Sequence, residues 1–393
     1  MNEAVIVGYA RTPIGKFGGG LSPLSAMDLG GRAITAALEQ AGVAPDQVDF
    51  TVMGHVLQAG QGQATARQAA RKAGIPMESP ALTVNMVCLS GMNAVHLADQ
   101  YIRLGDYDVV VAGGMESMSN APYLLPKARN GYRMGDGAVE DSMIHDGLWD
   151  AYDNEHMGSG NDRMAGKYGL SRQAQDEWAA MSHERAVNAW KDGRYTGEVV
   201  SVEVPQRRGN PVVVEQDEGM RPGASVESLG KLRPAFAKEG TTTAGNAAQI
   251  SDGAAALVLT SRPKAEELGL QPLARVISFG TVSGPDPSLH HQPAEAIRQA
   301  AQRIGQDPKT FDLYEINEAF AGVALHSTNL LGVDREKVNV NGGGVALGHP
   351  IGASGARITE GIIHELRNRG GGVGASALCG GGGQGYCLVV ETL

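Results

Sequence analysis

Apolar and polar positions along the chain predict strands that alternate with amphipathic helices. The first apolar run, EAVIVGYA, predicts a buried strand, and the loop RTPIGKFGGGLSP follows it. Across 25–41 apolar residues recur at helical spacing, at Leu29, Ile34, Ala37 and Leu38. Gly42 ends this predicted helix, Pro45 marks a turn, and VDFTVMG predicts the next strand.

The same pattern returns 263 residues later and indicates an internal duplication. AITAALEQAGVAPDQVDF begins at Ala33, and AIRQAAQRIGQDPKTFDL begins at Ala296. Residues that match without a gap include Ile34 with Ile297, Gly42 with Gly305, Pro45 with Pro308 and Asp49 with Asp312. At an offset of 264, Ser90-Gly91 matches Ser354-Gly355, and each pair opens a predicted helix that leads to an apolar strand ending in glycines.

Two copies of a strand–helix–strand–helix–strand unit predict a layered α/β body with a pseudo-twofold axis. Such units imply parallel strands joined by right-handed crossovers. The first half is predicted over 1–118, with 250–270 completing it, and the second over 271–393. Residues 119–249 match neither half and predict an inserted loop domain that covers a substrate site. Within it we expect a helix near 171–191 and strands in EVVSVEV and PVVVE.

Composition narrows the class of protein. The 393 residues suffice for two or three packed units, and 55 glycines imply many tight turns and close backbone approaches. A net charge of −10 argues against a nucleic-acid partner, and no apolar run reaches the roughly 18 residues of a membrane span. The 3 cysteines make no disulfide framework, and the N-terminal segment lacks signal-peptide features, so we expect a cytoplasmic protein.

One of the rare cysteines, Cys88, lies at a predicted strand-to-helix turn just before Ser90. The unpaired N–H groups of a helix start stabilise a thiolate, so we expect the pKa of this thiol to be lowered. The alternative is a small buried apolar residue. In the second copy His349 lies five residues before Ser354. If the two turns face each other, this histidine takes the thiol proton; otherwise it is an ordinary core histidine.

Two further motifs carry candidate chemistry. ALCGGGGQG places Cys379 at a strand end before four glycines, whose N–H groups suit an oxyanion hole, or simply form a tight turn. Asn317 in EINEAFAG could hold a catalytic water or cap a turn, whereas Cys387 is predicted to be core. Cysteine and histidine lack metal-ligand spacing, so no metal site is expected. A Cys-His-Asn set also fits a cysteine hydrolase, which has no need of the second thiol.

Taken together, these motifs resemble the thiolase family over nearly the whole chain. The segments that carry the resemblance are NMVCLSG, NEAF, GHPIGASG and CGGGGQG, in the family's order and approximate spacing. ESMSNAPY, EHMG and TAGNAAQISDGAAA are similar as well. The resemblance implies a five-layered αβαβα fold, assembly as homotetramer or homodimer, and an inserted domain that binds coenzyme A and makes oligomer contacts.

The resemblance also implies a role for each motif. Cys88 matches the nucleophile that carries the acyl group, and His349 matches the histidine that activates it and donates to a first oxyanion hole, where Asn317 holds a water. Cys379 matches the acid/base that takes the α-proton of the second acyl-CoA and protonates the departing CoA thiolate. The N–H groups of Cys88 and Gly381 would form a second oxyanion hole. Positions of the CoA or acyl site are matched by His156, Met157, Arg221, Phe236, Ala244, Ala248 and Phe320.

The activity implied is that of an acetyl-CoA C-acetyltransferase, which joins two acetyl-CoA into acetoacetyl-CoA and CoA through acyl-Cys88. Acyl-CoA thioesters are then the partners, with CoA as substrate and product and no tightly bound cofactor. The alternatives are a 3-ketoacyl-CoA thiolase of fatty-acid β-oxidation, a non-catalytic acyl-CoA-binding relative, and a Cys-His thioester hydrolase.

The chain departs from the family pattern beside the motifs. Leu89 follows the nucleophile where many members carry Gly, and Gly380 replaces a common Ile or Val. Ala248 stands where a CoA-contacting Ser is usual, and GPDPSLHHQPAEAI is unlike the family's Met-Gly loop near the acyl pocket. We expect Leu89 to add bulk near the thioester and favour short acyl chains, with Gly380 restoring some space.

Overall fold

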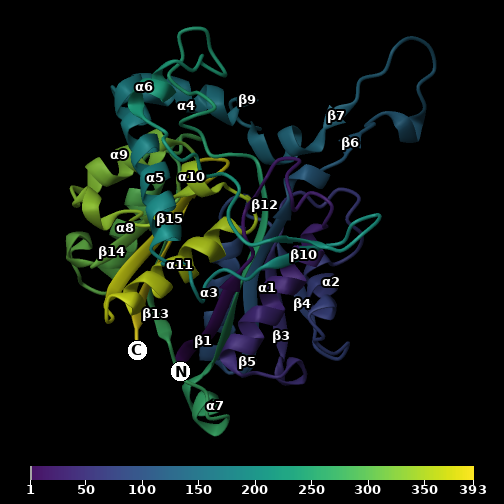
Figure 1. Ribbon diagram of the computed structural model, residues 1–393, viewed down its shortest axis with the longest axis vertical. Helices are drawn as coiled ribbons and strands as arrows, with labels where there is room; N and C mark the ends of the chain where they lie inside the picture. The colour runs from purple at the N-terminus through teal and green to yellow at the C-terminus, as the bar shows by residue number, and fades with distance from the viewer. Residues whose placement is uncertain (1) are drawn as a thin grey trace.

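The computed structural model describes residues 2–393 and shows two halves of similar topology side by side (Figure 1). The sheet of the N-terminal half has the order β4-β3-β5-β12-β1, and that of the C-terminal half the matching order β14-β15-β16-β13. The strands of the first half are β1 (Ala4–Arg11), β3 (Phe50–Gly54), β4 (Ala81–Val84), β5 (Val109–Ser117) and β12 (Ser251–Ser261). Those of the second are β13 (Ala274–Ser283), β14 (Leu313–Ile316), β15 (Val373–Gly380) and β16 (Gln384–Thr392). The two sheets meet where Ile6 of β1 pairs with Ala274 of β13.

The direction of the strands confirms the prediction of parallel strands within the duplicated unit. β3 runs parallel to β4 and β5, and β14 runs parallel to β15, as the duplicated unit predicts. β12 and β16, which follow the duplicated unit, run antiparallel to both of their neighbours, and this leaves β1 parallel to β5 and β13 parallel to β15. The reason is clear for β16, because only the glycine turn 381–383 separates it from β15, and so short a connection can join only antiparallel strands.

Six helices form the three helical layers of a five-layered fold, which confirms the predicted architecture. α1 and α2 cover the outer face of the first sheet, α3 and α11 lie between the sheets, and α8 and α9 cover the second sheet. Their bounds are α1 (Ala26–Ala41), α2 (Thr65–Lys72), α3 (Ser90–Leu104), α8 (Gln292–Arg303), α9 (Ala321–Leu331) and α11 (Ser354–Asn368).

Both faces of each sheet are buried, and β5 shows why its sequence is continuously apolar. Val109 and Val111 belong to the outer core, whereas Val110 and Ala112 belong to the central core between the sheets. Successive side chains of a strand point to opposite faces, so a strand between two helical layers needs apolar residues at every position. The run VVVA therefore follows from the layered packing.

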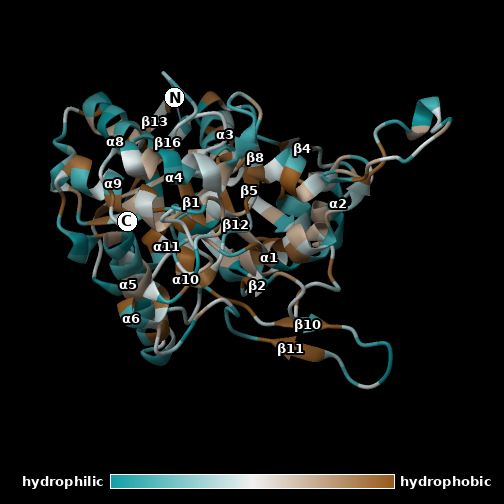
Figure 2. Cartoon of the chain, turned by 90° about the horizontal axis from the view of Figure 1, so that it is seen from above, coloured by the Kyte–Doolittle hydropathy of each residue, from teal (hydrophilic) through white to brown (hydrophobic). Residues whose placement is uncertain are grey.

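The segment between β5 and β12 forms a cap and two projecting arms. The predicted helix near 171–191 is confirmed as α5 (Arg172–Lys191), and the two predicted strand pieces pair as β10 (Val202–Val204) and β11 (Val212–Val214). Figure 1 shows the arm that carries β6 and β7 extending away from the body of the molecule. Figure 2 shows the second arm, the apolar β10–β11 hairpin, which projects from the body separately.

The remaining elements of this segment are β6 (Tyr123–Leu124), β7 (Glu140–Asp141), β8 (Trp149–Asp150), β9 (Glu155–His156), α4 (Met157–Lys167) and α6 (Val226–Gly230). Outside it lie the short strand β2 (Gly15–Lys16) and the short α-helices α7 (Arg262–Glu267) and α10 (Gly344–Leu347). Among residues 2–393, no helix combines the length and the apolar character needed to cross a bilayer.

Candidate active site

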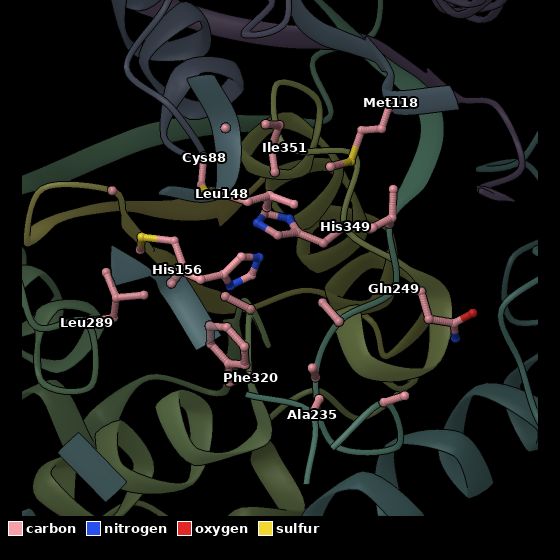
Figure 3. Close-up of a pocket in the computed structure, with 18 of the residues that line it drawn as sticks. Cys88, Met118, Leu148, His156, Ala235, Gln249, Leu289, Phe320, His349 and Ile351 are labelled. Carbon is pink, nitrogen blue, oxygen red and sulfur yellow. The ribbon is translucent and has the colours of Figure 1, made fainter. Parts of the chain in front are cut away.

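A cavity of about 530 Å³ is lined by both halves of the chain and by the inserted segment (Figure 3). It brings together four of the predicted catalytic residues, Cys88, His349, Cys379 and Gly381. It also contains every residue predicted for the CoA or acyl site, namely His156, Met157, Arg221, Phe236, Ala244, Ala248 and Phe320. The fifth predicted catalytic residue, Asn317, is buried behind the cavity wall, where it contacts His349. Residues far apart in the sequence thus form one largely apolar chamber.

Cys88 is presented by a strained turn at the start of α3. Val87 has φ +50°, a left-handed conformation that β-branched residues rarely adopt. Its N–H donates to Asn85 Oδ1 at 3.0 Å. Ser90 Oγ accepts the Met86 N–H at 2.8 Å and donates to the Val87 carbonyl at 2.5 Å. These bonds hold the turn and direct Cys88 into the cavity (Figure 3).

The apolar surroundings, not the helix start, dominate the electrostatics of the two thiols. Burial raises the pKa of the Cys88 thiol to about 12, against the opposing effect of the Cys88 and Gly381 N–H groups on its sulfur. The prediction of a lowered pKa is therefore wrong, because desolvation outweighs the helix terminus. Burial, followed by the proximity of Cys88, also raises the pKa of Cys379. Both residues are protonated thiols at neutral pH.

His349 is held as a neutral base. Its Nδ1 lies 2.6 Å from Ser354 Oγ, and the Ser354 hydroxyl donates to the Pro350 carbonyl at 2.9 Å. This chain of bonds places the ring proton on Nδ1 and leaves the lone pair on Nε2. Nε2 is buried without a hydrogen-bond partner among residues 2–393. Burial, and secondarily Arg357, lower the pKa of His349 to about 3, so the imidazole is neutral and its Nε2 lone pair is free.

Asn317 lies where it can bind a water beside this histidine. Its Nδ2 is 3.4 Å from His349 Nδ1, and its backbone N–H donates to the Ala377 carbonyl at 2.9 Å. Its Oδ1 is buried and has no hydrogen-bond partner in the described part of the chain. A buried carbonyl oxygen of this kind needs a donor, and a water molecule supplies one.

The opposite end of the cavity is built around an aromatic pair. The imidazole of His156 stacks on Phe236 with 4.6 Å between ring centroids, and His156 Nδ1 accepts the Gly158 N–H at 3.0 Å as the N-cap of α4. A Cβ at Gly158 would collide with the Phe236 ring, so glycine is required for this contact. Lys16 and Arg221 add two positive charges to the cavity lining, which suits a phosphorylated ligand. Lys16 was not predicted as a site residue.

The acyl end of the cavity differs from the sequence expectation at Leu89. This side chain is fully buried in the central core between the sheets rather than in the cavity wall. A Cβ at Gly380 would lie 2.6 Å from Leu89 Cγ, so Leu89 occupies the space that Gly380 leaves free. The prediction that Leu89 adds bulk beside the thioester is therefore wrong. The side chains around Cys379 are instead Leu289, Phe320 and Met157.

Sequence reasoning missed three residues that position the catalytic turns. Ser90 and Ser354 were predicted only as helix starts, although their repetition directly after the two candidate motifs was a signal for a shared role. Glu116 is fully buried and accepts the N–H groups of Val56 and Leu57, both at 3.1 Å, and of Gly352 at 2.9 Å. Its carboxylate thus ties the loop after β3 to the loop that carries His349.

The arrangement can form and attack a thioester. A partly buried thiol lies in one chamber with an uncharged base, and Gly381 and Cys88 supply N–H groups that can stabilise an oxyanion. The second thiol, Cys379, gives the chamber another group that can exchange a proton. In the part of the chain that the structure describes, no three His, Cys, Asp or Glu side chains gather as potential metal ligands.

Comparisons with known proteins agree with this chemistry. Residues 4–263 match the model of the thiolase N-terminal domain, and residues 270–392 match that of the thiolase C-terminal domain. The chain is 53% identical over 387 residues to a probable acetyl-CoA acetyltransferase of Mycolicibacterium smegmatis, covering 98% of this chain and 100% of that protein. It is 50% identical over 392 residues to an acetyl-CoA acetyltransferase of Cupriavidus necator, covering 100% of both. The crystal structure of the Bacillus anthracis acetyl-CoA acetyltransferase superposes with a TM-score of 0.97 at 42% identity, covering 100% of this chain and 99% of that one.

Proposed function

The chain belongs to the thiolase family, and from this premise we propose that it is an acetyl-CoA acetyltransferase that carries an acetyl group on Cys88. Two acetyl-CoA molecules would give acetoacetyl-CoA and free CoA in a reversible Claisen condensation. The observation that carries the proposal is the meeting of Cys88, His349 and Cys379 in one cavity. Relatives matched over their full length, at 53% and 50% identity, carry the name acetyl-CoA acetyltransferase or probable acetyl-CoA acetyltransferase.

In the first half-reaction, Cys88 would attack the thioester carbon of acetyl-CoA while His349 Nε2 takes its proton. Transfer between neutral groups suits a largely apolar chamber, because neither group has to be charged beforehand. The Cys88 and Gly381 N–H groups would stabilise the oxyanion of the tetrahedral intermediate. As the intermediate collapses, Cys379 would protonate the departing CoA thiolate and become a thiolate itself.

In the second half-reaction, the Cys379 thiolate would remove an α-proton from a second acetyl-CoA. His349, now protonated, and a water held by Asn317 Oδ1 would stabilise the resulting enolate oxygen. The enolate carbon attacks acetyl-Cys88, and the bond between carbon and sulfur breaks to release acetoacetyl-CoA. His349 then returns its proton to Cys88, so all three groups regain their starting protonation.

Coenzyme A is proposed to enter as substrate and leave as product. Lys16 and Arg221 would face its phosphates, and the stacked pair His156 and Phe236 would lie along its path to Cys88. The cytoplasmic location and the assembly as homotetramer or homodimer stay predictions of the sequence. The same is true of the domain boundaries.

Intact-mass measurement tests the proposal directly. Incubation with acetyl-CoA should add one acetyl group to the wild-type protein and none to Cys88→Ala. Acetoacetyl-CoA should form from acetyl-CoA with the wild type, and thiolysis should run when CoA and acetoacetyl-CoA are supplied. An adduct that persists in Cys88→Ala, or hydrolysis of acetyl-CoA without any condensation, would remove the basis of the proposal.

A further inference from the structure

Leu89 and Gly380, which directly follow the two reactive thiols in the sequence, interlock behind the cavity wall. A Cβ at Gly380 would lie 2.6 Å from Leu89 Cγ, and 3.0 Å and 3.2 Å from its two methyl carbons. Separations below about 3.0 Å are not tolerated between carbon atoms in a packed core. No side chain can therefore stand at position 380 while Leu89 keeps its place, and the two residues form a complementary pair.

The contact joins parts of the molecule that belong to different halves. Leu89 follows Cys88 at the start of α3, and Gly380 follows Cys379 at the end of β15. The first turn is anchored by Ser90 and the strained Val87, and the second by the pairing of Gly380 with Gln384 of β16. Because each turn is fixed to its own half, the contact between Leu89 and Gly380 determines how closely the two turns approach.

A second contact runs beside the first. A Cβ at Gly381 would lie 3.4 Å from Val87 Cγ1, so Gly381 packs against the residue before Cys88. Between these two contacts lies the Gly381 N–H, which opposes the rise in the pKa of the Cys88 thiol and therefore faces its sulfur. The position of this N–H relative to the sulfur is thus bounded on both sides, by Leu89 with Gly380 and by Val87 with Gly381.

We propose that Leu89 and Gly380 act as a matched positioning pair, which sets the Gly381 N–H and the Cys379 thiol at working distance from Cys88. The two residues depend on each other, since a leucine at 89 requires the missing side chain at 380. Its effect on turnover rests on the proposed function, whereas its effect on the reactivity of Cys88 does not.

Two single variants and their combination test the pair. Gly380→Ala should push the turns apart and lower kcat by about tenfold to a hundredfold, the effect of displacing an oxyanion donor or a reacting group. Leu89→Ala should lower kcat by about tenfold, with a smaller change in KM for acetyl-CoA. The double variant Leu89→Ala/Gly380→Ala removes the clash and should turn over faster than Gly380→Ala alone, which a double-mutant cycle quantifies.

A matched core variant separates positioning from plain loss of packing. Leu257 is fully buried in the same central core but lies in the middle of β12, so Leu257→Ala should lower the melting temperature comparably to Leu89→Ala while retaining kcat. If Leu89→Ala does not fold, Leu89→Val takes its place. Two results would contradict the proposed positioning role: equal losses of kcat in the variants at 89 and 257, or a double variant that turns over no faster than Gly380→Ala.

The rate of Cys88 alkylation by iodoacetamide tests the position of the Gly381 N–H relative to the Cys88 sulfur, and it does so independently of the proposed reaction. Loss of the Gly381 donor should slow alkylation severalfold in Gly380→Ala, and the double variant should recover part of this rate. A wild type that alkylates normally but does not condense acetyl-CoA would count against the proposed function alone. Unchanged alkylation in Gly380→Ala would count against the positioning pair alone.

Discussion

Gly91 and Gly355, which occupy matching positions in the two halves, face each other where α3 and α11 cross. A Cβ at Gly91 would lie 2.9 Å from the Ala356 nitrogen, and a Cβ at Gly355 would collide with the Met92 backbone. Only glycine at both positions lets the two helices approach so closely. Because Cys88 and His349 lie just before these helices, the crossing is what brings the two catalytic turns into one cavity.

We expect Gly355→Ala to weaken the protein and its activity together. The added methyl group meets backbone atoms that cannot move aside, and overpacking of this kind costs about 1–3 kcal/mol of unfolding free energy. Separation of the helices should also lower kcat. Gly361→Ala, in the same helix, is the control, because nothing lies within 4 Å of a Cβ there. Denaturant unfolding and condensation assays should show a loss only at position 355; equal losses at both positions would contradict the crossing argument.

The internal sequence repeat made the architecture predictable. The chemistry of the site could be predicted only in outline. Ser90-Gly91 and Ser354-Gly355 gave the two helices and their opposed turns, since such a pattern needs no long-range detail. The ionisation of Cys88 was mispredicted, because burial by distant segments outweighs the local helix start. The place of Leu89 was mispredicted for a related reason, because its neighbour Gly380 is 291 positions away in the sequence. Local patterns cannot reveal such pairings.

Cys379→Ala should separate the two half-reactions. Acetylation of Cys88 by acetyl-CoA needs the nucleophile and His349, and the CoA thiolate is a good leaving group even without a proton donor. Removal of the α-proton needs a base, and alanine provides none. We therefore expect acetyl-Cys88 to form, while condensation and thiolysis fall by more than about a thousandfold. Mass spectrometry and steady-state rates check this, and an equal loss of acetylation would show that Cys379 acts earlier.

The raised pKa of Cys88 can be tested by the pH dependence of its alkylation in His349→Ala. Burial raises the pKa of this thiol to about 12, so its thiolate fraction rises about tenfold per pH unit below that value. Without the histidine to take the proton, alkylation of Cys88 by iodoacetamide should follow this fraction between pH 7 and pH 9. The wild type should react faster at pH 7 and depend less on pH. A rate in His349→Ala that stays constant with pH would mean that the thiol is already ionised.

Leu289→Ala should extend the range of acyl chains that the enzyme accepts. Leu289 packs with Phe320 beside Cys379 and lines the cavity, so its truncation opens space at the acyl end. We expect kcat/KM for thiolysis of C6 and C8 ketoacyl-CoA to rise about tenfold relative to C4, the discrimination that a few methylene groups supply. Val323→Ala is the control, because Val323 shares the same cluster without lining the cavity. An unchanged ratio would place the acyl end elsewhere.

Directly after Leu289, the buried His290 makes a distinct contribution to the pH dependence of stability. Its side chain is 1% exposed, and within the described residues neither ring nitrogen has a hydrogen-bond partner. Burial, and then His326 and His291, lower its pKa to about 3. Below about pH 6.5 the unfolded state therefore binds a proton at His290 that the folded state does not bind. As the pH falls from 6.5 toward 3, this difference lowers the free energy of unfolding.

Replacement of this histidine should reverse that effect. Relative to the wild type, His290→Leu should gain about 2 kcal/mol of unfolding free energy between pH 7 and pH 5. The difference between the two proteins is the quantity to measure, because other buried groups also shape the wild-type profile: burial raises the pKa values of Glu315 and Glu360, which contribute with the opposite sign. Denaturant unfolding of both proteins at pH 7, 6 and 5 provides it. A difference that does not change with pH would mean that the folded protein protonates His290 near its ordinary pKa.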